Sequence, residues 1–395
     1  MKACAILLCA ALLGGCASTT PLDQLPAAPQ LFHDQLFDAP ARPVEIDHIF
    51  AVNADMRAYL QREVSHNLLH KDVRRVLFEA LYRKDKLQLE YDAAMTRDAA
   101  ETFAARSGNC LSLAIMTAAL ARELNLNVQF QQVQVDESWS RAGDLYFASN
   151  HVNLVLGQQR TDIRNGFGVD LSSPLTVDFI PITAKARENA RPLDETTIIA
   201  MYLNNRGAEL LAQGQYDQAY WLVRKAIEQA PAFLHAYNTL AVIYQHHGNL
   251  PEAERTLRYA LQQRPDNVIV LSNLAQTLES QALPDKRAEA AQLRLKLAQL
   301  EPEPPFYYFN LGQAAMRIGD FERARELFRR ELARVPDYHE FHFWLALADY
   351  RLGYLREADM HMVKALANST TRSDHALYAA KLDKLRAYEA AALQK

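Results

Sequence analysis

The stretch that decides the fold of the C-terminal half is Gly214–Pro231, GQYDQAYWLVRKAIEQAP. It recurs as GNLPEAERTLRYALQQRP at Gly248–Pro265 and as GDFERARELFRRELARVP at Gly319–Pro336. Each copy opens on glycine, has alanine five residues later and closes on proline. Since glycine suits a turn and proline cannot continue a helix, each copy predicts one helix between the two. Copies at a fixed spacing predict a stack of similar units.

The period of this stack identifies the kind of unit. Pro231 and Pro265 are 34 residues apart, and so are Pro302 and Pro336. A 34-residue period with a turn glycine between two helices resembles the tetratricopeptide repeat. The resemblance implies five repeats over residues 200–372, beginning near residues 200, 234, 268, 305 and 339. The third repeat lacks the turn glycine and has three extra residues.

The same resemblance implies what surrounds and what contacts the repeats. Residues 375–393 form the capping helix that a stack of repeats needs at its end. A protein or peptide partner is expected on the repeats. Four aromatic side chains are interpreted either as contacts for that partner or as core: Phe306, Phe309, Trp344 and Tyr350.

The N-terminus carries a targeting pattern. Lys2 precedes an apolar run that is too short to span a bilayer and ends in Leu13-Gly14-Gly15-Cys16. This ending resembles the lipobox of bacterial lipoproteins, which implies a signal peptide over residues 1–15 and a lipid on Cys16. Ala17, rather than aspartate, follows, and this resemblance favours the outer membrane, with the protein facing the periplasm. The proline-rich residues 16–45 are predicted to form an extended tether.

Removal of the signal peptide leaves Cys110 as the one unlipidated thiol of the mature chain. It lies in SGNCLS, where a glycine turn leads into an Ala- and Leu-rich helix over residues 111–124. The positive end of a helix favours thiolate over thiol, so we expect a lowered pKa for Cys110.

A thiol nucleophile needs a base and a group that orients the base. His151 begins an alternating run, HVNLVL, and Asp178 lies in the next alternating run, LTVDFI. Adjacent strands would bring these two side chains together. Asp170 is the rival to Asp178 for the third position.

Three segments together carry a second resemblance. They are RSGNCLSLAIMTAALARELNLNVQFQQV, NHVNLVL and LTVDFIP, and they resemble the transglutaminase-like superfamily of papain-type cysteine enzymes. This implies an α+β domain over residues 46–195 with the catalytic residues Cys110, His151 and Asp178. It implies acyl transfer or hydrolysis at an amide bond, without a metal or an organic cofactor. The aromatic residue that usually follows the histidine is absent, which leaves the substrate open.

Composition limits the remaining classes of protein. The 395 residues give room for two or three domains, and 49% hydrophobic with 23% charged residues is typical of a globular protein. A net charge of −4 argues against nucleic acid as a partner. The sequence therefore predicts a multidomain protein, α+β first and then an all-α repeat solenoid. Two functions stay open: a lipid-anchored envelope cysteine enzyme, or an inactive scaffold that assembles envelope proteins through its repeats.

Overall fold

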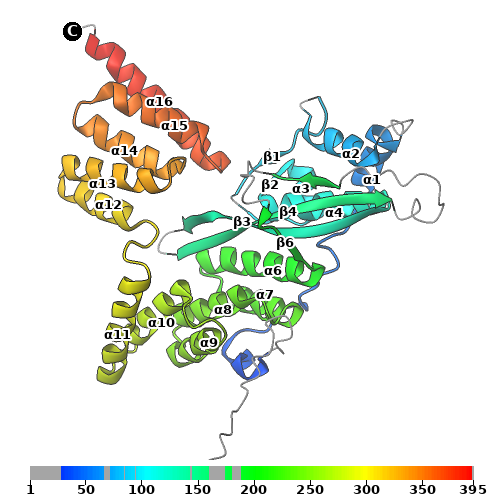
Figure 1. Cartoon of the computed structure of the whole chain (residues 1–395), viewed down its shortest axis with the longest axis horizontal. Coiled ribbons are helices and arrows are strands. Elements are labelled where there is room, and N and C mark those ends of the chain that lie inside the picture. Colours follow the sequence, from blue (N-terminus) through cyan, green and yellow to red (C-terminus); the bar gives the residue numbers. More distant parts are fainter. Residues whose placement is uncertain are drawn as a thin grey trace, which may run out of the picture.

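The structure is a computed structural model that describes residues 28–65, 72–83, 85–93, 95–142, 145–159, 174–179 and 188–393. Side chains are not described for 134–150, 158–159 and 391–393. The predicted signal peptide, Cys16 and Asp170 lie outside the described residues. Figure 1 shows a sheet with helices packed beside it, followed by a long run of paired helices.

The sheet has four antiparallel strands in the order β5-β4-β3-β6. Alternate residues of its central strand β4 are fully buried, namely Val152, Leu154 and Leu156. Side chains two apart share a face of a strand, so these three form one apolar face. The strands are β3 (Leu126–Ala142), β4 (Leu145–Gln159), β5 (Leu175–Val177) and β6 (Arg191–Leu193).

The helix α4 (Cys110–Glu123) packs against β3 and β4, and its residues 111–121 are buried. The other elements before α6 are shorter. They are η2 (Pro29–Leu31), η3 (Asp34–Leu36), α1 (Ala54–Glu63), α2 (Val73–Tyr82), β1 (Glu90–Tyr91), α3 (Ala99–Ala105) and β2 (Ser107–Gly108).

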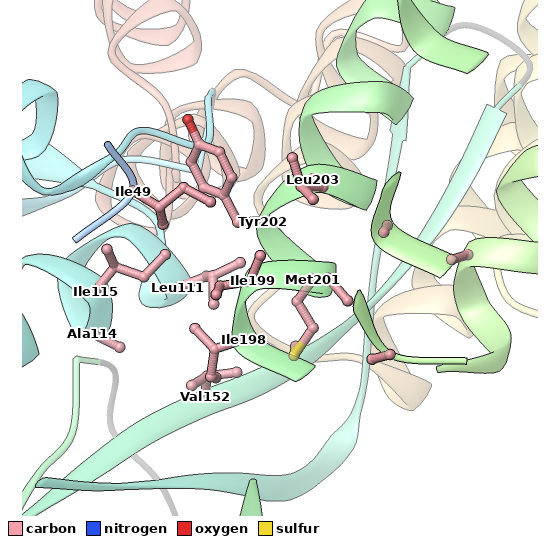
Figure 2. Close-up of a cluster of buried hydrophobic side chains, with 14 of the residues drawn as sticks. Ile49, Leu111, Ala114, Ile115, Val152, Ile198, Ile199, Met201, Tyr202 and Leu203 are labelled. Carbon is pink, nitrogen blue, oxygen red and sulfur yellow. The ribbon is translucent and has the colours of Figure 1, made fainter. Parts of the chain in front are cut away.

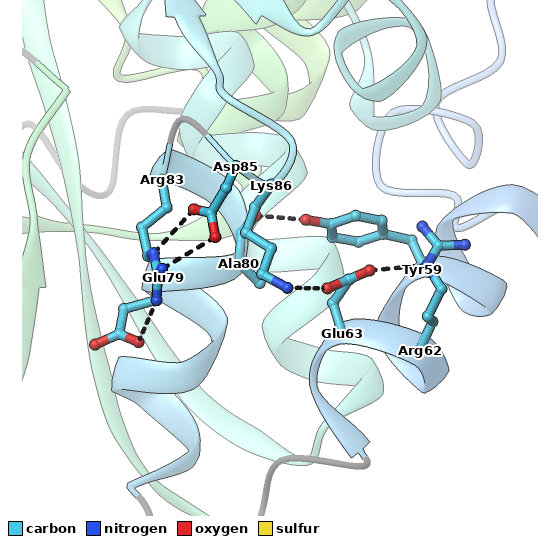
Figure 3. A network of polar contacts seen from close by, with 8 residues as sticks. All are labelled: Tyr59, Arg62, Glu63, Glu79, Ala80, Arg83, Asp85 and Lys86. Carbon is cyan, nitrogen blue, oxygen red and sulfur yellow. Dashed lines mark hydrogen bonds and ion pairs between the residues drawn. The ribbon is translucent and has the colours of Figure 1, made fainter.

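A polar network joins α1 to α2 and to the loop after α2 (Figure 3). The Tyr59 hydroxyl donates to the carbonyl of Ala80. Glu63 accepts from Lys86 at 2.6 Å and from Arg62 at 2.8 Å. These contacts fix α1 against α2 at the end of the domain away from the repeats.

Five helix pairs and a final helix make up the described residues 195–393. The pairs are α6 (Glu195–Ala212) with α7 (Tyr216–Gln229), α8 (Leu234–His247) with α9 (Leu250–Gln263), α10 (Val268–Ser280) with α11 (Pro284–Leu300), α12 (Tyr307–Ile318) with α13 (Phe321–Arg334), and α14 (His339–Arg351) with α15 (Leu355–Ala367). The final helix is α16 (Arg372–Leu393).

Small residues allow the two helices of a pair to approach closely. A Cβ atom at Gly312 would lie 2.5 Å from Cε1 of Phe328 on the facing helix. The turns between paired helices use a positive φ, as at Gly248 (91°). In the third pair Ala282 takes that conformation, with φ 59°.

The first helix of the repeats shares the core of the α+β part. Ile198, Ile199 and Tyr202 of α6 are buried in one cluster with Leu111 and Val152 (Figure 2). The sequence predicted separate domains on the two sides of residues 195–200. The structure instead has one core that continues across this boundary. The reason is that α6 is apolar around much of its circumference over residues 198–203, and such a helix is buried on more than one side.

A division of the core occurs further along the chain. The described buried side chains form three clusters: one that extends from the α+β part to α11, one over residues 306–348, and one over residues 346–382. Figure 1 shows the chain turning between α11 and α12, where the first cluster ends. Phe306 and Phe309 belong to the second cluster, so they are core residues and not exposed peptide contacts; Trp344 packs against it, whereas Tyr350 is 39% exposed.

The N-terminal segment also differs from the prediction. Residues 16–45 were expected to be an extended tether, but Leu31 and Phe37 are buried against the helices of the first two repeats. Pro29 opens the first of two short 3-10 turns, and an aromatic residue that follows each turn, Phe32 and Phe37, has a surface on which to pack.

Candidate functional site

The local chain path fixes Cys110 at the start of α4. Asn109 caps the helix, because its side chain accepts from the backbone N–H of Ser112 at 2.9 Å. Gly108 is required beside it, since a Cβ there would lie 2.7 Å from Cβ of Ser112. Cys110 is half-buried and is the one free cysteine among the described residues.

The surroundings of Cys110 hold its thiol in the neutral form. Burial raises the pKa of Cys110, and backbone hydrogen bonds from Val152 and Leu111 lower it by less. The expected lowered pKa is therefore wrong: burial outweighs the helix end, because a low-dielectric site penalises the thiolate. The contact with the backbone of Val152 places the sulfur beside β4. Val152 directly follows His151 in that strand.

His151 lies on β4, and Asp178 directly follows the neighbouring strand β5. Leu154 pairs with Val177, which puts Asp178 opposite Asn153 on the face of the sheet that His151 shares. Nε2 of His151 is 4.0 Å from Oδ1 of Asp178. Burial lowers the pKa of His151, and the Asp178 carboxylate raises it by less.

The structure brings His151 close to Asp178 but does not join His151 to Cys110 by a hydrogen bond. Neither ring nitrogen of His151 has a hydrogen-bond partner among the described residues, so the ring does not bond to the thiol of Cys110. His151 is 3% exposed. A neutral imidazole without a partner retains a lone pair that can accept a proton.

Two residues of this site were missed by the sequence analysis. Asn153 donates from Nδ2 to Oδ1 of Asp178 at 2.5 Å. It could have been found, because residues two apart on a strand share a face. Tyr91 pairs with Gly108 through β1 and β2, and the residue is 37% exposed; partial burial and the nearby Cys110 raise the pKa of Tyr91. No sequence signal marks it, since β1 has only two residues.

Other kinds of site were sought in the described part of the chain. It contains no group of three His, Cys, Asp or Glu side chains placed to hold a metal ion. No helix in the described ranges has the length and apolar character to cross a membrane. A hollow of about 470 Å³ lies beside α1, lined by Tyr59, Arg62, Glu63 and other residues, but Cys110 does not line it.

Known proteins resemble this chain in its repeats. A TPR repeat-containing protein of Pseudomonas aeruginosa is 28% identical over 156 residues, which is 39% of this chain and 26% of that protein. The type IV pilus assembly protein PilF of the same organism is 33% identical over 129 residues, 32% of this chain and 50% of PilF. The chain thus spans about a quarter to a half of these relatives.

Among solved structures, a thermophilic TPR protein of Thermus thermophilus is 20% identical. The match covers 46% of this chain and 98% of that one, with a TM-score of 0.30. The tetratricopeptide repeat family matches residues 210–258 and again residues 309–358. The C-terminal part of the chain therefore contains tetratricopeptide repeats, a unit that serves protein interaction.

Proposed function

We propose that this protein is a lipid-anchored cell-envelope cysteine enzyme that acts on an amide bond through Cys110, His151 and Asp178. One observation carries the proposal: the sulfur at the start of α4 lies close to the backbone of Val152, the neighbour of His151, whose ring lies 4.0 Å from Asp178. A transglutaminase-like arrangement requires this meeting of a helix start and two strands. The repeats would bind a protein partner that carries or presents the substrate.

The chemistry assigns a step to each residue. His151 removes the thiol proton as the sulfur of Cys110 attacks the carbonyl carbon, and Asp178 stabilises the imidazolium that forms. The backbone N–H groups of Cys110 and Leu111 at the start of α4, which lie beside the sulfur, would hold the negative oxygen of the tetrahedral intermediate. His151 then gives its proton to the leaving amine, and a thioester remains on Cys110. Water or a second amine attacks the thioester, which gives hydrolysis or acyl transfer.

The neutral state of both groups fits this order of events. The raised pKa of Cys110 and the lowered pKa of His151 describe a thiol beside a neutral imidazole, and a neutral imidazole is the form that accepts a proton. Proton transfer then accompanies attack instead of preceding it. The His151 ring must first come within hydrogen-bond distance of the sulfur, because neither of its nitrogens bonds to the thiol.

A second function is an inactive scaffold that assembles envelope proteins through its repeats. The observation in its favour is the same burial: the thiol is protonated, and His151 makes no hydrogen bond within the described residues. A buried cysteine at a helix start is then simply a small core residue.

Labelling of Cys110 with an iodoacetamide probe separates the two functions. For the enzyme we expect Cys110 of the folded wild-type chain to be labelled at pH 7 with His151 as general base, although burial raises the pKa of the thiol. Substitution of His151 by alanine should slow the labelling by about 10²–10⁴, the usual effect of general-base assistance. The Asp178→Ala chain should lose less. Equal labelling of wild type and His151→Ala supports the scaffold instead.

A further inference from the structure

We propose that the surface formed by α7, α8 and α9 is a peptide-binding site, and that residues 28–38 are a displaceable ligand bound to it within the same chain. The partner that fits is an extended peptide with the chemistry of this segment, an aspartate three residues before a phenylalanine that a second aspartate follows. Figure 1 shows the blue N-terminal segment lying beside these helices. This inference is independent of the proposed enzymatic function.

Side chains of the repeats form hydrogen bonds with the main chain of residues 28–38. The backbone N–H of His33 donates to the hydroxyl of Tyr220 at 3.0 Å and to that of Tyr244 at 3.1 Å. The Tyr244 hydroxyl donates in turn to the carbonyl of Leu31 at 2.8 Å. Recognition of backbone groups by side chains is how a protein surface holds an extended peptide.

Side chains of α7 also form hydrogen bonds with the main chain at the end of the segment. Nε1 of Trp221 donates to the carbonyl of Asp38 at 2.7 Å, and the backbone N–H of Asp38 donates to Oδ1 of Asp217 at 2.8 Å. Every one of these main-chain contacts is independent of the segment's own side chains. A different peptide with the same backbone path would therefore keep them.

Two side chains of the segment supply specificity. Phe37 stacks on Tyr220, with ring centroids 4.0 Å apart and planes inclined by 10°, and it also contacts His247. Asp34 accepts from the Tyr220 hydroxyl at 2.6 Å and pairs with Nε of Arg224 at 3.0 Å. An aromatic anchor and a paired carboxylate are the features that we expect a competing peptide to reproduce.

An exposed stretch of chain joins the segment to the rest of the fold. Residues 38–43 are exposed and include Pro40 and Pro43, whereas Ile49 is fully buried and holds the following chain in the main core. The segment makes only two 3-10 turns and joins no sheet. Such a section opens locally at a small fraction of the free energy of global unfolding.

Because the segment is part of the same chain, a partner peptide must compete with it at a high effective concentration. A ligand on a short linker acts at an effective concentration of about 1 mM, so it shields the site from weaker peptides. Removing the anchor groups Asp34 and Phe37 from the chain should expose the site to a peptide added in solution. This difference between the two chains is the basis of the test.

The probe is a fluorescent synthetic peptide of residues 28–40, APQLFHDQLFDAP. Binding is measured by fluorescence polarisation to the full wild-type chain and to the full chain with Asp34→Ala and Phe37→Ala. We expect the variant to bind the peptide at least about tenfold more tightly than wild type, because the internal competitor is weakened. A control peptide with the same two substitutions should not bind. If the intact peptide binds neither chain, or binds both equally, the proposal is overturned.

Two further chains keep the test decisive. Adding Tyr220→Phe to the variant keeps the stacking ring but removes the hydroxyl that contacts His33 and Asp34, so peptide affinity should fall by about tenfold. Unchanged affinity would show that the peptide binds elsewhere. If the double variant is not folded by circular dichroism, a chain cut at a protease site inserted at residues 39–43 replaces it. Its N-terminal fragment should exchange with the peptide in excess; a fragment that never exchanges contradicts displacement.

Discussion

Burial, rather than the helix dipole, decides the ionisation of the candidate catalytic residues. The thiol of Cys110 and the ring of His151 are both held neutral, although an N–H from Val152 and a carboxylate from Asp178 act in the opposite direction. A low-dielectric site penalises either charge more than one neighbouring dipole or one carboxylate 4.0 Å away can offset. The site at rest is therefore a neutral pair.

The carboxylate of Asp178 can be tested as the partner of His151. In Asp178→Asn we expect the pKa of His151 to fall further below its ordinary value, because the negative charge that stabilises the imidazolium is lost. An NMR titration of the His151 ring measures this shift. The exposed Asp266→Asn serves as the control and should leave the titration unchanged. A His151 pKa that is the same in Asp178→Asn and wild type contradicts the pairing.

The sequence could suggest which residues form the candidate site but not whether their side chains are charged. A glycine turn before an apolar helix indicated Cys110, and two runs of alternating apolar residues indicated His151 and Asp178. Both are local patterns, which a sequence shows directly. The direction of the pKa of Cys110 depends on what buries it, and Tyr91 reaches the site through a two-residue strand. Both depend on tertiary packing, which local patterns do not encode. The catalytic roles of the three residues stay a prediction.

At the scale of elements, glycine and proline predicted the helix boundaries of the repeats well. Turn glycines mark four of the five helix pairs, and the helices end near the prolines. The exception is the third pair, where Ala282 adopts φ 59° at the turn. A residue with a Cβ is strained in this left-handed conformation.

Relief of this strain is a direct test of the third turn. Ala282→Gly should raise the free energy of unfolding by about 1 kcal/mol, because glycine adopts a positive φ without the Cβ penalty. Chemical denaturation of the full chain measures the change. Gly248→Ala is the matched opposite substitution, at φ 91°, and should destabilise the chain. A destabilising Ala282→Gly would contradict the strain.

Element-scale patterns failed where a segment's partner is distant in sequence. The prolines of residues 16–45 predicted a tether, and nothing local shows that Phe37 stacks on Tyr220. The apolar positions of α6 predicted a repeat helix but not its burial against Val152. Each of these contacts joins residues far apart in the chain.

The whole molecule is organised by its three clusters of buried side chains rather than by two domains. The first cluster joins the sheet, α4 and the helices up to α11, and the second begins at Phe306. Cooperative unfolding follows shared buried contacts. The part of the chain before α12 should therefore unfold as one unit, separately from the cluster over α12–α14 and the cluster over α14–α16.

Two matched core substitutions test this organisation. Leu154→Ala removes a buried side chain from the first cluster, and Phe328→Ala removes one from the second; each should cost about 2–5 kcal/mol. Hydrogen exchange should show Leu154→Ala weakening protection in the sheet and in α6 together. Phe328→Ala should weaken protection in α12–α14 and leave the sheet unchanged. Equal loss across all helices in both variants would contradict separate units.

Membrane attachment is the remaining expectation at this scale. Cys16→Ser should leave the protein unprocessed or release it from membranes, because stable attachment needs the several chains of a lipoprotein. Fractionation of cells that express each chain measures this. Wild-type protein found in the soluble periplasmic fraction would contradict the lipid anchor.

The central claim is that Cys110 is a nucleophile assisted by His151, and trapping of the acyl-enzyme tests it most directly. The full chain is mixed with p-nitrophenyl acetate at pH 7, quenched in acid and analysed by peptide mass spectrometry. The account predicts an acetyl group on Cys110 in wild type, none on that position in Cys110→Ala, and formation slower by about 10²–10⁴ in His151→Ala. An acetyl group absent from wild-type Cys110, or formed equally fast in His151→Ala, would contradict it.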